Sequence, residues 1–184
     1  CGDLIFVFLN VLAVKVPQLD IAHFSVSQEG GYPEYFQYLK WSLIVLLLFC
    51  ISFKRRSLLY FSWIAVFLYF LIDDSFAVHE TIGQFLSKRL AFTPPFGLRG
   101  QDIGELMVYG VAGIFLLFPL ISAYVFGSQT FKRFSHDVFL FLLAIIFFGV
   151  FIDVLHIALI LGPKLDFAFS IFEDGGEMLV ASFI

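Results

Sequence analysis

Several runs of apolar residues in this chain are about as long as a lipid bilayer is thick. The clearest of them cover residues 33–53, 57–76, 105–125 and 138–161. A helix needs about 20 apolar residues to cross about 30 Å of hydrocarbon. Lipid offers no hydrogen-bond partner to the backbone, so such runs predict helices, and no period-two pattern indicates strands. The sequence therefore predicts an all-α, polytopic transmembrane helical bundle.

Two further apolar runs lie at the ends of the chain. Residues 4–16 predict the last part of a first span, and residues from 166 onward predict the beginning of a last one. Both are shorter than a full crossing, so we expect both termini to be truncated. The chain thus predicts about six spans, and residues 1–184 are expected to form a single transmembrane domain.

Composition supports this class and excludes others. Hydrophobic residues make up 60% of the 184 residues and charged residues only 14%, whereas about 25% of a soluble domain is charged. The net charge of −4 and the lack of a basic stripe exclude a nucleic-acid partner. We expect membrane lipids as partners, and other membrane protein subunits if the chain belongs to a larger complex.

Positive charge in the short loops predicts the orientation. The turn after residue 53 is Lys54-Arg55-Arg56, and the turn after residue 125 contains Lys132 and Arg133. Cytoplasmic loops are enriched in Lys and Arg. We therefore expect these two turns on the cytoplasmic face of a bacterial inner membrane that the chain crosses several times.

Ionisable residues inside the predicted spans indicate a functional site. Each such residue costs about 2.5–3.5 kcal/mol on membrane-insertion scales, so it is functional by default. The chain carries them in three groups: Asp73, Asp74, His79 and Glu80; Asp153 and His156; and Glu173, Asp174 and Glu177.

The three groups are predicted to lie at one depth. At the helical rise, Asp73 and Asp153 lie about 24 Å and about 22 Å from the cytoplasmic ends of their spans. Glu173 lies about 10 Å from the outer end of its span by the same rise. All three groups therefore fall in the outer leaflet, and we expect them to converge.

The residue types in these groups favour a divalent metal ion. At 100° per residue, Asp73 and Glu80 share a helix face, as do the pairs Asp153/His156 and Glu173/Glu177. No Lys or Arg lies within the groups to neutralise them, and carboxylate with imidazole suits Fe, Mn or Zn. Paired carboxylates on facing helices are also typical of dimetal bundles. The predicted ligands are Asp73, His79, Glu80, Asp153, His156, Glu173 and Glu177, with Asp74 and Glu105 behind them.

Other functions remain open at this stage. The acids can form a structural network of neutral, hydrogen-bonded groups, or part of a proton or ion path. The protein can also be a non-catalytic accessory subunit of a larger membrane complex. Whether it is an enzyme is undecided; a bound metal would activate water, with Glu80 as the base.

At these residues the chain resembles an uncharacterised family of bacterial polytopic inner-membrane proteins. That family carries an acidic pair followed by His-Glu, an acid in a later glycine-containing span, and a final Glu-x-x-Glu-Met motif. The matching residues are Asp73-Asp74 with His79-Glu80, then Gly149 with Asp153, then Asp174 with Glu177-Met178. Asp153 stands where the family pattern has Glu. The resemblance implies a polytopic fold and a shared acidic and histidine site, but no activity.

The site is also similar to that of the membrane-embedded zinc hydrolases of the ceramidase and adiponectin-receptor type. Those enzymes combine Ser, Asp and His in one leaflet, as Asp74, Ser75 and His79 do here. Their His-x-x-x-His pair is absent from this chain. This resemblance implies lipid hydrolysis as one alternative enzymatic activity.

Overall fold

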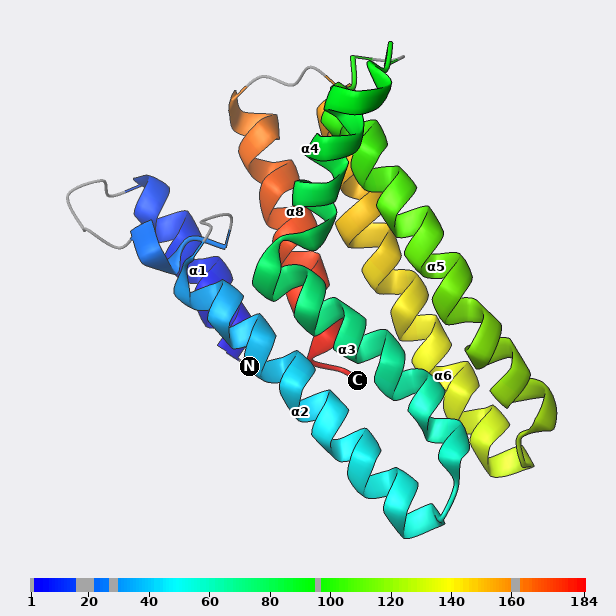
Figure 1. Ribbon diagram of the computed structural model, residues 1–184. Coiled ribbons are helices and arrows are strands. Elements are labelled where there is room, and N and C mark those ends of the chain that lie inside the picture. Colours follow the sequence, from blue (N-terminus) through cyan, green and yellow to red (C-terminus); the bar gives the residue numbers. More distant parts are fainter. Residues whose placement is uncertain (1, 16–21, 27–29, 95–96, 160–162) are drawn as a thin grey trace. The chain divides into compact units, whose positions relative to one another are not determined.

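The computed structural model describes the chain except for residues 1, 16–21, 27–29, 95–96 and 160–162. The described residues form helices and turns and contain no β-strand, so the predicted all-α class is confirmed. In chain order (Figure 1) the elements are α1 (Gly2–Lys15), η1 (Ala22–Phe24), α2 (Tyr32–Arg55), η2 (Leu58–Tyr60), α3 (Phe61–Phe76), α4 (Val78–Leu90), α5 (Gly100–Phe126), α6 (Gln129–Ile146), η3 (Phe147–Ile152), α7 (Asp153–Ala158) and α8 (Pro163–Ala181).

Within the described residues, four helical segments are long and apolar enough to cross a membrane. They are Tyr32–Arg55, Leu58–Phe76, Gly100–Phe126 and Gln129–Ala158. The first helix is apolar but short, and α8 carries four carboxylates along its 19 residues. The expected class of membrane protein is supported, whereas the predicted six spans are not confirmed.

The chain divides into two compact units. The first unit comprises Cys1–Lys40 and Phe139–Ile184, and the second unit comprises Trp41–Val138. Helices α2 and α6 therefore each contribute residues to both units. The single domain expected over residues 1–184 stays a prediction.

Aromatic side chains form the core of the second unit. Trp41, Trp63, Phe67 and Phe131 are almost completely buried. The Trp41 and Trp63 rings both lie against Phe67, with ring centroids 6.0 Å and 6.2 Å away. Trp63 Nε1 donates a hydrogen bond of 2.9 Å to the Ser135 hydroxyl of α6. A buried indole N–H needs such a partner, so this bond fixes the start of α6 on α3.

The start of α6 explains a difference from the sequence analysis. The helix begins at Gln129 rather than near residue 138. Its first turn is capped, because the Ser128 hydroxyl accepts the Phe131 N–H at 3.3 Å. Phe131 and Ser135, one turn apart, are both buried. This amphipathic segment contains polar residues that a hydropathy window excludes from a span.

Two basic turns share one end of the second unit. Tyr60 of η2 contacts the rings of Phe131 and Phe134 of α6, at 5.1 Å and 5.3 Å between centroids. The turn at Arg56 therefore lies beside the start of α6. This agrees with the expectation that the two turns face one side.

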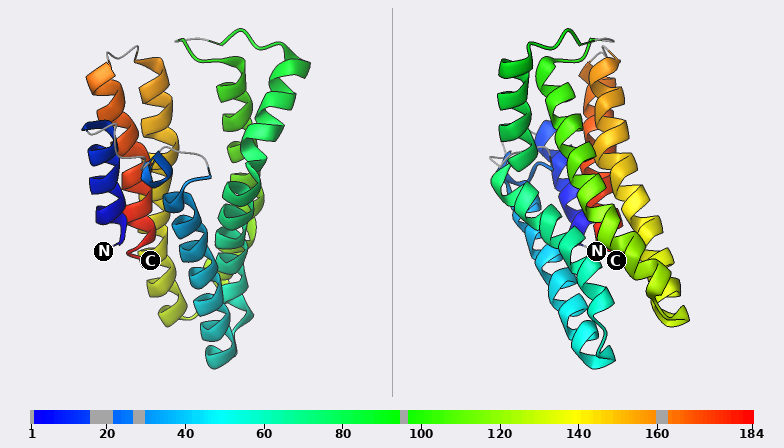
Figure 2. Two further views of the ribbon diagram at one scale, coloured as in Figure 1. Left: turned by 90° about the vertical axis from the view of Figure 1, so that its left-hand side faces the viewer. Right: turned by 45° about the vertical axis from the view of Figure 1, so that its right-hand side comes forward.

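Close glycine contacts join α4 and α5, which run side by side in Figure 2. A Cβ on Gly104 would lie 2.2 Å from the Gly83 carbonyl oxygen, and a Cβ on Gly100 would lie 2.5 Å from the Ser87 hydroxyl. Both distances are far inside van der Waals contact. The two backbones can approach this closely only because these positions lack side chains.

The first unit is built around α8. This helix packs against α1 and against the π-helical turn η3. A Cβ on Gly176 would meet the Phe148 ring of η3 at 2.4 Å, and one on Gly175 would meet Val7 of α1 at 3.2 Å. The Gly-Gly pair thus permits close packing on two sides.

Candidate functional site

Asp73 and His79 form a close pair in the second unit. His79 Nδ1 lies 2.9 Å from Asp73 Oδ2, and the His79 backbone N–H donates to Asp73 Oδ1 at 2.9 Å. The Asp73 side chain is 2% exposed. One carboxylate therefore holds both the imidazole and a free N–H at the start of α4.

A break between α3 and α4 makes this pair possible. Ala77 has a left-handed backbone, with φ of 45°, and separates the two helices. A straight helix over residues 73–80 would place Asp73 and His79 on different faces. The break at Ala77 overturns that placement, because it turns His79 back toward Asp73.

His79 is surrounded by further polar groups of the same unit. Its ring stacks on Tyr109 of α5 at 4.9 Å, and its Nε2 lies 3.9 Å from Glu80 Oε1. Burial lowers the pKa of His79, but the hydrogen bond and charge of Asp73, with the charges of Glu105 and Glu80, outweigh it and raise the pKa above 6.5.

Asp74 and Glu105 engage other partners. Trp41 Nε1 donates a hydrogen bond of 2.7 Å to Asp74 Oδ2, and Gln101 Nε2 donates one of 2.7 Å to Glu105 Oε1. Both acids were expected behind the ligands. The hydrogen bonds from Trp41 and Gln101 orient the Asp74 and Glu105 carboxylates.

His156 lies between two carboxylates in the first unit. Its Nδ1 is 3.2 Å from Glu173 Oε2, and its Nε2 is 3.1 Å from Asp166 Oδ1. Glu173 is 21% exposed and Asp166 is 65% exposed, so the imidazole connects an inner carboxylate to an outer one. The sequence analysis missed Asp166, although it lies seven residues before Glu173 and therefore on the same face of α8.

Two more acids of the first unit act on the trio formed by His156, Glu173 and Asp166. The charges of Asp174 and Asp153 both act on the Glu173 carboxyl group. Asp153 follows the π-helical turn Phe147–Ile152, a form of helix that occurs frequently at functional sites. Asp153 and His156 therefore both interact with Glu173 in the first unit.

Glu177 has a different environment from the one predicted. Its carboxylate lies over Gly149, where a Cβ would be 2.7 Å from Glu177 Oε2. The nearby ammonium group of Lys40 interacts electrostatically with it. Glu177, a predicted metal ligand, therefore already interacts with a positively charged side chain, that of Lys40.

Lys40 is the main feature that the sequence analysis missed. Its ammonium group donates to Asp3 Oδ1 at 2.8 Å and to the Met178 carbonyl at 2.7 Å, and the Ser182 hydroxyl donates to Asp3 Oδ2 at 2.8 Å. Lys40 and Asp3 are both buried. The expectation that no Lys or Arg neutralises the acids was therefore wrong for the group that contains Glu177, because Lys40 interacts with it. The sequence did indicate a role for Lys40, since a charged residue inside an apolar segment is functional by default.

In the arrangement of the described residues, no three His, Cys, Asp or Glu side chains are placed so that they could hold a metal ion. Among the predicted ligands, the structure thus pairs His79 with Asp73 in the second unit and places His156 against Glu173 in the first. Their predicted convergence on a single site stays a prediction.

The family of the chain follows from a comparison over nearly its whole length. Residues 4–184 match the model of a family described as a domain of unknown function, DUF8692. No curated protein and no solved structure matches the chain. The protein belongs to the DUF8692 family.

Proposed function

We propose that this protein is a membrane protein that binds a divalent cation beside His156. The observation that carries the proposal is the carboxylate oxygen at each of the two ring nitrogens. A neutral imidazole has one N–H and one lone pair. The N–H satisfies one carboxylate, but the lone pair repels the other unless a cation lies between them.

The distances are compatible with a metal ion on the inner side of the ring. Two ligands that are each 2.0–2.2 Å from one metal are about 2.8–3.6 Å apart. The 3.2 Å between His156 Nδ1 and Glu173 Oε2 lies in this range. On the other side, Nε2–H would donate to Asp166, and a metal-ligating histidine usually donates its second N–H to a carboxylate. His156 and Glu173 are therefore the proposed ligands, and Asp166 the group that orients the ring.

Further oxygen ligands are close by. Asp153 and Asp174 act electrostatically on Glu173, so a small side-chain rearrangement would complete a set of one nitrogen and several oxygens. Such a set suits Fe, Mn or Zn. Glu177 is not included, since Lys40 already supplies a positive charge near it.

Metal analysis of the purified protein tests this proposal. After removal of any affinity tag and loading with Zn²⁺, Mn²⁺ or Fe²⁺ under anaerobic conditions, the wild type should retain about one ion per chain after gel filtration. His156→Ala and Glu173→Gln should lose it, whereas His136→Ala should not, because His136 is 66% exposed and lies in the other unit. A metal-loaded wild type that retains no ion, or whose His156 is still an imidazolium by ¹⁵N NMR, would show that the cation is a proton, and the metal proposal would fail.

We also propose a bacterial inner membrane as the location, with residues 54–56 and 132–133 in the cytoplasm. The support is the density of Lys and Arg in these two turns. Alkaline phosphatase fused after Arg56 should be inactive, and after Arg99 active. The opposite pattern would reverse the orientation.

A further inference from the structure

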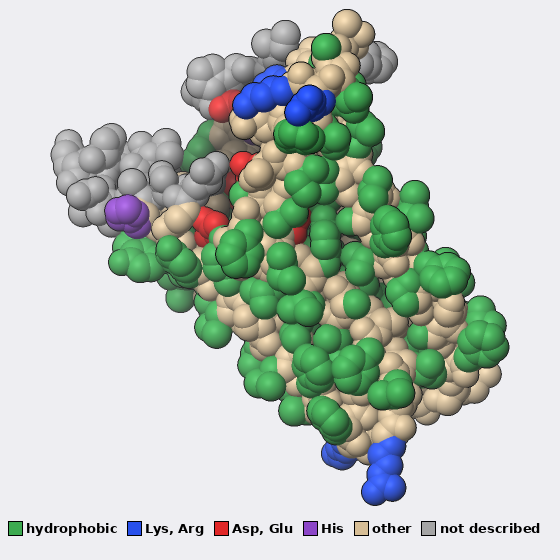
Figure 3. Space-filling model, viewed as in Figure 1, with side chains coloured by type: hydrophobic (Ala, Val, Ile, Leu, Met, Phe, Trp, Pro, Cys, Tyr) green, Lys and Arg blue, Asp and Glu red, His purple; other side chains and the backbone are tan. Residues whose placement is uncertain are grey.

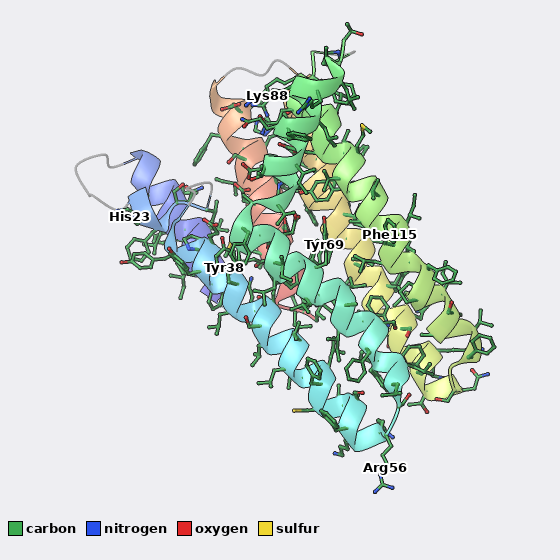
Figure 4. All side chains as sticks on the ribbon, viewed as in Figure 1. His23, Tyr38, Arg56, Tyr69, Lys88 and Phe115 are labelled. Atoms are coloured by element: carbon green, nitrogen blue, oxygen red, sulfur yellow. The ribbon has the colours of Figure 1, made fainter. Side chains whose placement is uncertain are left out.

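Five cationic side chains gather at one end of the second unit. Lys54, Arg55 and Arg56 end α2 and form the following turn, and Lys132 and Arg133 lie in the first turns of α6. The ring contacts between Tyr60 and α6 bring these segments side by side. Figure 3 shows Lys and Arg side chains at this lower end, where Figure 4 labels Arg56.

Protein carboxylates do not neutralise this end. Among the residues that the structure describes, none of the five cations makes an ion pair with an acid. Lys132 instead places its ammonium group 5.7 Å from the Tyr124 ring centroid, and the nearby Asp137 carboxylate faces His136 at 3.6 Å. The end therefore presents concentrated positive charge to an external anion.

Exposed apolar side chains lie near the cations in the sequence. Phe53 precedes Lys54 and is 74% exposed, and Leu58 follows the turn and is 81% exposed. Phe126, at the end of α5, is 82% exposed. An anionic phospholipid has a negatively charged headgroup joined to apolar chains, so a surface with both features fits it better than it fits a soluble anion.

The backbone at Arg56 is a second, independent observation. Arg56 has φ of 49°, a left-handed conformation in which glycine is usual at a helix C-terminus. The turn is closed by hydrogen bonds from Arg56 N–H to the Phe53 carbonyl at 3.2 Å and from Ser57 N–H to the Ser52 carbonyl at 3.1 Å. The chain therefore places a guanidinium at the tip of this turn, at a position where glycine could replace it without backbone strain.

We propose that this basic end, formed by Lys54, Arg55, Arg56, Lys132 and Arg133, binds the headgroups of anionic phospholipids. The cations contact the phosphates, and the exposed apolar residues contact the upper acyl chains. Each Lys or Arg near an anionic membrane surface contributes about fivefold to the affinity. Removing three of them should weaken binding about a hundredfold by the same rule.

Thermal unfolding of the full chain in nanodiscs tests the proposal. Nanodiscs of phosphatidylcholine alone should be compared with nanodiscs that also contain phosphatidylglycerol. We expect phosphatidylglycerol to raise the Tm of the wild type, the increment to shrink with added salt, and the variant R55Q/R56Q/R133Q to lose it. The matched control is K88Q/R89Q, at the opposite end of the second unit, where Figure 4 labels Lys88; it should keep the increment.

The single variant Arg56→Gly separates lipid binding from folding. Glycine relieves the left-handed strain, so this variant should be at least as stable as the wild type in phosphatidylcholine. It should nevertheless gain less stability from phosphatidylglycerol. The proposal is overturned if phosphatidylglycerol gives no increment, if Arg56→Gly and the triple variant keep the full increment, or if K88Q/R89Q loses as much.

Discussion

Replacement of Lys40 by methionine should strongly destabilise the first unit. The change keeps the length of the side chain but removes the ammonium group that donates to Asp3 at 2.8 Å and to the Met178 carbonyl at 2.7 Å. Asp3, 2% exposed, would keep the hydrogen bond from the Ser182 hydroxyl but lose its neutralising cation. Breaking a buried ion pair by removing one partner costs about 3–5 kcal/mol, because the other charge stays buried.

A double-mutant cycle measures the interaction between Asp3 and Lys40 directly. Replacing both residues, as Asp3→Leu with Lys40→Met, removes the orphaned charge along with its partner. The double variant should recover most of the loss, since apolar replacement of a whole buried pair is often neutral or stabilising. We therefore expect a coupling free energy above about 2 kcal/mol between the two positions.

The assay is reversible unfolding in mixed micelles, followed by circular dichroism. Lys88→Met serves as control, because the hydrogen bond of 3.4 Å from Lys88 to Gln84 is exposed; its effect should stay within about 0.5 kcal/mol. If Lys40→Met changed the free energy of unfolding no more than this control does, or if the two substitutions were additive, the account of Lys40 would be refuted.

Three further predictions concern the helix contacts and the second histidine. Gly104→Val should reduce stability by about 1–3 kcal/mol, as measured by unfolding, because its side chain would overlap the carbonyl of the facing glycine on α4; an unchanged stability would contradict the close crossing. Gly149→Ala should move the Glu177 carboxylate from its position over η3, which a difference in the infrared carboxylate band on ¹³C labelling would detect, whereas an identical band would argue against this contact. The raised pKa of His79 means that its pairing with Asp73 contributes stability fully below about pH 6.5. This contribution should be lost as pH rises through the folded-state pKa, and His79→Gln should abolish that pH dependence; a wild type with the same pH profile as the variant would disprove it.

The long apolar helices could be predicted from the sequence, because hydropathy and length largely determine them. Residues 33–53 and 105–125 lie inside α2 and α5. The start of α6 could not be found in this way, since the burial of Phe131 and Ser135 depends on the neighbouring Tyr60 and Trp63. Hydropathy does not include such tertiary contacts.

The candidate site could be predicted only in part. The residue types placed His156 and Glu173 in one set of candidate ligands, and the structure puts His156 Nδ1 3.2 Å from Glu173 Oε2. The pairing of Asp73 with His79 depends on the left-handed backbone at Ala77, which alanine does not signal as glycine would. Lys40 was overlooked, although a charged residue in an apolar span is itself a signal.

X-ray absorption of the zinc-loaded protein tests the central claim most directly, since it reports the atoms around the ion. We expect one imidazole nitrogen and carboxylate oxygens at about 2.0–2.2 Å, with the imidazole signal absent in His156→Ala. A spectrum of fully hydrated zinc, or an imidazole signal that survives in His156→Ala, would contradict a cation site between His156 and Glu173.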